Sequence, residues 1–279
     1  MLTSNNNFQT VKSGLPIYFF FYKYTEDQKY KHKFQFFLQE EIAKLLIFES
    51  SHKDSGIKVS LEDYISRIKD DQKVIFYLAA PSRTLAEASP YYENLKSRNQ
   101  EVLFCYEPYD ELVLMTLQQF KNYKVVSVEK DMRDDKKAAD LTNLGLDSLK
   151  RSEIDELTKW LKDKLAGKAA TVSATNRLEN HPCVVTVEEM AAARHFVKTQ
   201  SHQVPEERRY ALLQPQFEIN PKHPIIKKMY KLMVSDRDLA ELLAKQLFAN
   251  AMVGAGLVDD PRVLLTSMND LLAKCLEKH

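Results

Sequence analysis

Residues that could perform nucleotide or hydrolytic chemistry are sparse in this chain. Its 279 residues include only six glycines, and none opens a helix directly after an expected strand, where backbone amides would approach a phosphate. The P-loop pattern is absent, as is the G-x-S-x-G sequence that exposes a catalytic serine. The sequence therefore predicts neither a phosphate-binding loop nor a site for covalent catalysis.

Histidines, cysteines and carboxylates do not form a metal-ligand pattern either. The seven histidines are scattered, and the closest pairing, His181 with Cys183, has no second pair at zinc-site spacing. Adjacent acids such as Glu188 and Glu189 lie at expected helix ends, where stabilising the helix dipole is their more common role. We expect no metal site, no catalytic residue and no cofactor in this chain.

Composition and charge exclude some partners. The 40 basic and 39 acidic side chains leave a net charge of +1, so the overall field gives no argument for nucleic acid or an anionic membrane. The apolar run over 15–22 is far shorter than the roughly 20 residues that span a bilayer. Cys105, Cys183 and Cys275 lie in apolar stretches, which is typical of reduced core thiols.

The elements that would position any site begin with an alternating unit of strands and helices. Apolar runs at 74–78, 102–105 and 124–128 predict strands covered on both faces, with helical periodicity between them. Pro90 must interrupt or restart the first connecting helix. Right-handed crossovers make these strands parallel, so we expect a three-stranded parallel sheet of βαβαβ form. Upstream, a helix over 40–48 and a second one capped by Ser60 are expected.

The chain divides into four segments. Residues 1–39 have no clean period and are expected to be divergent and poorly ordered, whereas 40–130 hold the α/β unit. Residues 131–150 are charged and thinly apolar, which predicts a solvated linker. Residues 151–279 combine two or three strands with several helices and a polar loop over 201–209. The expected fold class is therefore α/β followed by α+β.

Two long amphipathic helices are expected at the end of the chain. The first runs over 236–256, and the second follows an Asp260 cap with Pro261 in its first turn. Two hairpinned helices cannot bury their apolar stripes alone, so these are completed either by the rest of the domain or by a symmetry mate in a four-helix bundle. The candidate interface residues are Leu243, Leu247, Leu264, Met268, Leu271, Leu272 and Cys275.

A short alanine-rich helix over 188–199 is a second candidate for binding. Met190, Phe196 and Val197 lie on it beside a polar loop, and flexible apolar side chains suit recognition of varied proteins. Ordinary core packing is the alternative, and the residues by themselves favour it.

Several segments closely resemble the heat shock protein 90 chaperone family, most of all its mitochondrial, tumour necrosis factor receptor-associated branch. The resemblance covers about Glu40 to His279. The matching stretches are EEIAKLLIFESS (40–51), the residues 60–112 that end in VLFCYEPYDEL, EEMAAARHF (188–196), LLQPQFEINPKHPIIKK (212–228) and GLVDDPRVLLTSMNDLLAKCLEKH (256–279).

The resemblance implies a domain assignment and a function. It makes 40–130 the end of the family's middle domain and 151–279 its dimerisation domain, whose last two helices pair with a second protomer. It implies assistance to protein folding, with client proteins contacting Trp160, Met190, Phe196 and Val197. The family's ATPase domain, which uses ATP and Mg²⁺, is not among the matched segments, so we expect this chain not to be an enzyme by itself.

The resemblance also implies partners and a location. Partners would be a second copy, a full-length chaperone in a mixed dimer, and unfolded or partly folded clients. The location would be the mitochondrial matrix, or the cytoplasm if an import signal is lacking. Two other functions stay open: a small α/β enzyme with a ligand site at the crest of its parallel sheet, and a non-catalytic dimerisation module.

Overall fold

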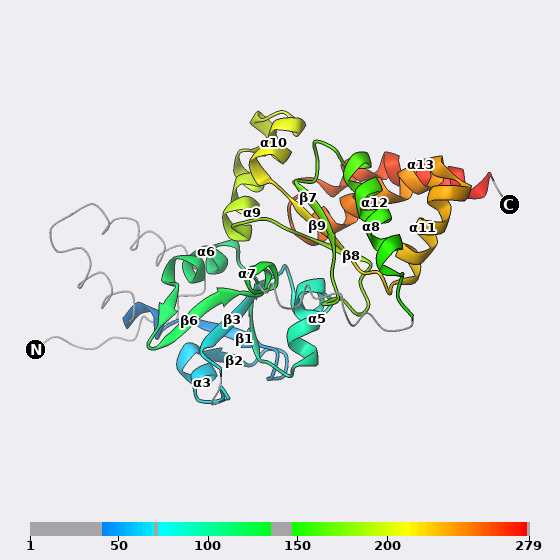
Figure 1. The fold of residues 1–279 in the computed structure, drawn as a ribbon. Helices are drawn as coiled ribbons and strands as arrows, with labels where there is room; N and C mark the ends of the chain where they lie inside the picture. Colours follow the sequence, from blue (N-terminus) through cyan, green and yellow to red (C-terminus); the bar gives the residue numbers. More distant parts are fainter. Residues whose placement is uncertain (1–40, 70–71, 135–146, 278–279) are drawn as a thin grey trace, which may run out of the picture. The chain divides into compact units, whose positions relative to one another are not determined.

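The computed structural model describes residues 41–69, 72–134 and 147–277 (Figure 1). The expectation of disorder for residues 1–39 lies outside these residues. The chain forms two compact units: the first ends at Ala88 and resumes over Arg98–Val128, and the second comprises Ser89–Ser97 and the chain from Glu129 onward. Sequence placed the division close to this point, at 130, but gave no sign that 89–97 belongs with the second unit.

The first unit is built on a six-stranded mixed sheet in the order β2-β1-β4-β3-β6-β5. The three predicted strands are present as its parallel members, with β3 paired to both β4 and β6. Three further strands pair antiparallel at the two sides, so the expectation of a sheet with only three parallel strands is wrong. The strands are β1 Ile47–Ser50, β2 Lys58–Ser60, β3 Val74–Ala79, β4 Val102–Cys105, β5 Gln119–Phe120 and β6 Tyr123–Ser127.

Strand β1 replaces the end of the helix that was predicted over 40–48, of which residues 41–43 are helical. Along β1, exposure alternates from Ile47, which is exposed, to Phe48, which is buried, as expected for a strand with one covered face. The predicted helical face also fails at Leu45, which is largely exposed. A run of nine residues is too short for its periodicity to separate helix from strand, and pairing with β4 decides the outcome.

Helices of the first unit begin where local chemistry predicts. Ser60 caps α3 (Leu61–Ile65) through a capping box with Asp63, and the helix buries Leu61 and Tyr64. Pro90 does restart the connecting helix: α4 (Arg83–Glu87) ends before it, and α5 (Pro90–Ser97) begins on it. Helix α6 (Pro108–Leu117) follows β4.

The second unit has a three-stranded sheet in the order β7-β9-β8, with β7 parallel and β8 antiparallel to β9. Helix α5 belongs to it through a hydrogen bond from the Tyr91 hydroxyl to the Val185 carbonyl. Its elements are β7 Thr171–Ala174, β8 Cys183–Thr186, β9 Gln216–Ile219, α8 Arg151–Lys164, α9 Met190–Thr199, α10 Glu206–Leu213, α11 Pro224–Ser235, α12 Arg237–Gly254 and α13 Leu265–Leu276, with short 3-10 helices at Ser201–Gln203 and Pro261–Leu264.

Two connecting segments differ from prediction. Helix α7 (Val128–Asp134) occupies the start of the predicted solvated linker and buries Glu129 and Met132, while residues 135–146 lie outside the described residues. The predicted polar loop over 201–209 contains the start of α10, whose acidic first turn is a helix-start signal that was missed. None of the helices that the structure describes is both long and apolar enough to cross a membrane.

Candidate functional site

The strongest candidate for a functional surface is the hairpin of α12 and α13. Helix α12 packs into the second unit through one face, whose fully buried members include Ala240, Ala244 and Phe248. Helix α13 has no buried residue at all. An amphipathic helix that hides none of its apolar side chains is incompletely packed within its own chain.

The two sides of α13 differ in what they contact. Leu264, Ser267 and Leu271 recur at helical spacing and are half-buried, so this side faces α12. A hydrogen bond of 3.0 Å from the Ser267 hydroxyl to Gln246 Oε1 fixes the alignment of the two helices. The adjacent side carries Leu265, Met268, Leu272 and Leu276, which are 56%, 48%, 52% and 71% exposed.

The predicted interface residues therefore fall into three groups. Met268, Leu272 and Cys275 lie on the exposed side, whereas Leu243, Leu264 and Leu271 are half-buried. Leu247 is buried, and its carbonyl oxygen accepts a hydrogen bond from the Cys183 thiol. The chain itself thus covers the side of α12 that carries Leu247, which argues against a direct contact of this side chain with a second copy.

Sequence reasoning missed Leu265, Leu276 and Val263, all of which are exposed. The signal was available: 265, 268, 272 and 276 follow one another at steps of three and four, the spacing of a single helix face. The predicted stripe instead mixed this side with the side toward α12. Cys275 is also a correction, because it is exposed rather than a core thiol.

The four predicted client-binding residues lie in the second unit, and three of them are core. Trp160, Met190 and Val197 are buried, and the Met190 sulfur accepts a hydrogen bond from the Val187 amide. The structure thus has these three side chains in the core packing that the residues by themselves favour. Trp160 lies on the buried side of α8, and Met190 and Val197 lie on the buried side of the amphipathic helix α9. Phe196 is half-buried and keeps part of its ring accessible.

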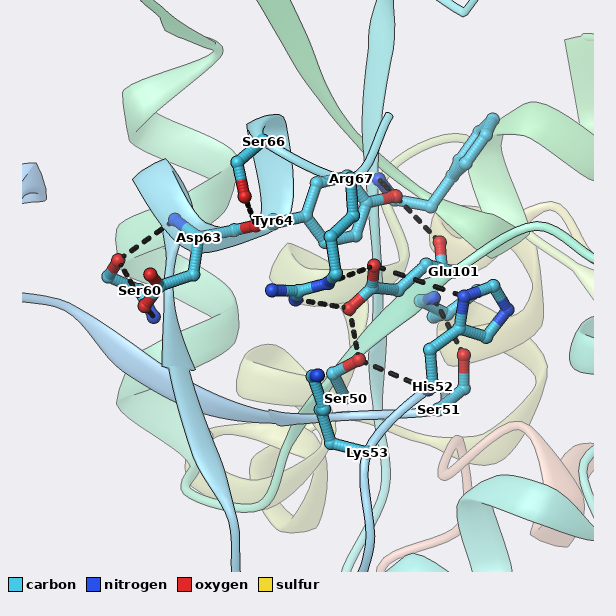
Figure 2. Close-up of polar contacts among 12 residues, drawn as sticks. Ser50, Ser51, His52, Lys53, Ser60, Asp63, Tyr64, Ser66, Arg67 and Glu101 are labelled. Atoms are coloured by element: carbon cyan, nitrogen blue, oxygen red, sulfur yellow. Dashed lines mark hydrogen bonds and ion pairs between the residues drawn. The ribbon is translucent and has the colours of Figure 1, made fainter. Parts of the chain in front are cut away.

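In the first unit, polar chemistry concentrates at Glu101, at the start of β4. Arg67 donates to both carboxylate oxygens of Glu101, at 2.6 and 3.1 Å, and Ser50 donates a further hydrogen bond to Oε1. His52 Nδ1 lies 4.0 Å from Oε2. Figure 2 shows the side chains of Arg67, Ser50 and His52 around the Glu101 carboxylate. Sequence gave no sign of this cluster, because its members are up to 51 residues apart.

Tyr64 joins the Glu101 cluster through the backbone of Glu101. Its hydroxyl donates to the Glu101 carbonyl at 2.6 Å and accepts from the Phe76 amide at 3.2 Å. Burial raises the pKa of Tyr64 to about 12, so it stays a neutral donor. Both Glu101 oxygens accept from neighbouring side chains, so the cluster joins β1, α3 and β4 rather than presenting a free acid or base.

Other reactive groups are enclosed or dispersed. Burial raises the pKa of the Cys183 thiol to about 12, which makes it a poor nucleophile. Within the described ranges, His, Cys, Asp and Glu side chains form no group of three that could hold a metal ion. The exposed apolar side of α13 thus remains the main candidate surface.

Comparison with known proteins identifies the family. The family model described as Hsp90 protein matches residues 8–279. The chain belongs to the Hsp90 family. The match also corrects the resemblance seen in the sequence, which began near residue 40, because the family pattern extends through most of the first 39 residues.

Individual relatives agree with this assignment. Heat shock protein 75 kDa, mitochondrial, of Rattus norvegicus is 47% identical over 87% of this chain and 35% of its own length. The TNF receptor-associated protein 1 homolog, mitochondrial, of Dictyostelium discoideum is 34% identical over 86% of this chain and 34% of its own length. Chaperone protein HtpG of Desulfitobacterium hafniense is 31% identical over 85% of this chain and 38% of its own length. This Hsp90-family chain thus spans about a third of each of these chaperone relatives.

Proposed function

We propose that this chain is a dimerising, client-holding part of an Hsp90-type chaperone, in which α12 and α13 pair with their counterparts in a second copy. The observation that carries the proposal is the side of α13 formed by Leu265, Met268, Leu272 and Leu276, which its own chain leaves exposed. Two such hairpins would form a four-helix bundle, in which each exposed side covers the other.

The energetics favour a second copy over solvent. Burying the exposed part of each of these side chains contributes about 1 kcal/mol. The free energy from the four side chains of one protomer is therefore small beside the cost of association, which is roughly 4–15 kcal/mol. A two-fold axis doubles the contribution because every side chain enters the interface twice. A longer chaperone that carries the same hairpin would be an equivalent partner in a mixed dimer.

Client contact is proposed for the outer surface of the second unit. Phe196, on α9, is half-buried, and Leu212, on α10, is 61% exposed. Apolar side chains of this kind suit partly folded proteins that expose apolar residues themselves. Trp160, on α8, and Met190 and Val197, on α9, are buried and would take part only if those helices moved to expose them.

We further propose that these residues do not hydrolyse ATP by themselves, and that ATP and Mg²⁺ act in other regions of the longer relatives. Support comes from the four glycines that the structure describes, Gly56, Gly167, Gly254 and Gly256, none of which follows a strand to open a helix. A mitochondrial location is proposed because the similar proteins of Rattus norvegicus and Dictyostelium discoideum are named as mitochondrial.

Sedimentation velocity of the purified chain over a wide concentration range tests dimerisation. We expect a reversible dimer, and a monomer at the highest concentration would refute the proposal. Suppression of aggregation of a thermally unfolded model protein, compared for the native sequence and Phe196→Ser with Leu212→Ser, tests client holding. Saturable binding of labelled ATP at micromolar concentration would instead favour the small-enzyme alternative.

A further inference from the structure

A buried arginine lies behind the hairpin. Arg194, on α9, is only 9% exposed and donates from Nε to the carbonyl oxygen of Ala255 at 2.8 Å. Ala255 is the C-cap of α12, at the turn that leads to α13. Helices α9 and α12 belong to the same compact unit. Figure 1 shows them at different places around its small sheet.

The turn that Arg194 holds has a defined geometry. The Gly256 amide donates to the Val253 carbonyl, and the Leu257 amide donates to the Met252 carbonyl, which is the Schellman pattern of a helix end. Gly256 has a φ of +69°, and a Cβ there would lie 3.3 Å from Arg194 Nε. The positive φ favours glycine at this position, and any other side chain would also lie tightly against Arg194.

The same arginine reaches the first helix after the unit boundary. Its Nη2 donates to Glu129 Oε1 at 2.6 Å, and Glu129 is 1% exposed. A second ion pair, Lys130 with Glu189 at 3.0 Å, joins the same two helices at the surface. Because a buried charge is tolerated only with its partner in place, the position of α7 and that of the turn after α12 are both tied to one guanidinium group.

We infer that Arg194 is a positioning residue for dimerisation: through Ala255 it sets the direction in which the chain leaves α12, and hence the side that α13 presents to a partner. The inference rests on the proposed function, because it assigns a role in pairing through α13. Helix α13 has no buried residue, so its orientation depends on the Ser267–Gln246 hydrogen bond, on its half-buried contacts with α12 and on the turn at Ala255 and Gly256 that leads to it.

Comparison of two matched variants, Arg194→Met and Arg177→Met, tests the inference. Arg177 is also buried and also forms an ion pair, at 2.6 and 2.8 Å to Glu218, but its described partners are Thr175 and Glu218, on and beside the sheet. Both variants should lower the Tm of the chain. Only Arg194→Met should also raise the dimer Kd, by roughly tenfold or more, the size of ordinary coupling between sites.

Hydrogen exchange of residues 257–264 gives a second readout, and it should accelerate in Arg194→Met beyond its change in Arg177→Met. If Arg194→Met does not fold, Arg194→Lys keeps the charge but cannot span Glu129 and Ala255 together, and it should shift the Kd in the same direction. Equal Kd changes in the two arginine variants, or none for Arg194, would overturn this inference alone. A monomeric unmodified chain would overturn the proposed function and this inference with it.

Discussion

The sheet of the first unit and the hairpin of the second handle their side chains in opposite ways. Around β4, the buried carboxylate of Glu101 has its charge matched by Arg67, and the large apolar residues Phe104 and Phe120 are covered. Along α13, Leu272 and Leu276 are more than half exposed. The first region satisfies its buried groups within one chain, whereas the second leaves an apolar side uncovered, which we propose that a second copy covers.

The largest expected effect separates these regions most directly. Met268→Asp with Leu272→Asp places two charges on the exposed side of α13, and we expect the dimer Kd to rise about 1,000-fold, or on the order of 4 kcal/mol. The Tm of the isolated chain should change little, because neither side chain is buried in it. Sedimentation velocity measures the Kd.

Thr266→Asp is the matched control, because Thr266 is exposed and shares its side of α13 with Asp270 and Ala273 rather than with Leu272. It should leave the dimer intact. Changing Leu271 together with Leu272 would test the interface less directly, because half-buried Leu271 faces α12 and its replacement would also disturb folding. An unchanged dimer mass in the double aspartate variant would place the interface elsewhere.

Arg67→Met should have the reverse signature. It leaves the buried Glu101 carboxylate without its cation, so we expect a loss of about 3 kcal/mol in the free energy of unfolding of the first unit. Urea denaturation followed by tyrosine fluorescence measures this loss, and the dimer Kd should not change. Lys121→Met, which removes an exposed ion pair with Glu62, should leave the free energy of unfolding nearly unchanged.

Tyr64→Phe tests what the Tyr64 hydroxyl contributes to the stability of the same cluster. It removes one hydroxyl that donates to the Glu101 carbonyl and accepts from the Phe76 amide, while the ring stays in place. A buried donor and acceptor lose their partners, at a cost of about 1–3 kcal/mol. A neutral result in urea denaturation would mean that water replaces the hydroxyl.

The smallest effect concerns pH and the second unit. His223 caps α11, because its Nδ1 accepts a hydrogen bond from the Ile225 amide. Burial, and to a smaller extent the nearby His181, lowers the pKa of His223 below 6.5, whereas a backbone hydrogen bond to Asn180 raises it. Glu93 and Lys227 also face it. Because the folded state favours neutral His223, its contribution to stability is complete above pH 6.5 and is lost as pH falls through the lowered pKa.

His223→Asn keeps a capping acceptor that does not titrate. We expect thermal unfolding of this variant to depend less on pH below 6.5 than that of the unmodified chain. An identical pH profile would assign the dependence to another group. His52→Asn, in the first unit, provides the comparison for a histidine beside Glu101.

Sequence patterns predicted individual helices and strands better than they predicted how the strands pair. The strands at 74–78 and 102–105, the Ser60 cap and the helix that starts after Asp236 follow from local residue chemistry and are present. Strands β1, β2 and β5 were missed because segments of two to four residues carry no usable period. Helix α10 was missed because it buries no residue.

For the candidate surface, residue order was enough to show that apolar residues recur along the whole last helix, and the family pattern extends over residues 8–279. The folded chain was needed to show which side of α13 faces α12, that Leu247 and Met190 are buried, and that Arg194 contacts Glu129 and Ala255. The reason is physical: a helical period fixes which residues share a side, but the side that is covered depends on elements far away in the chain.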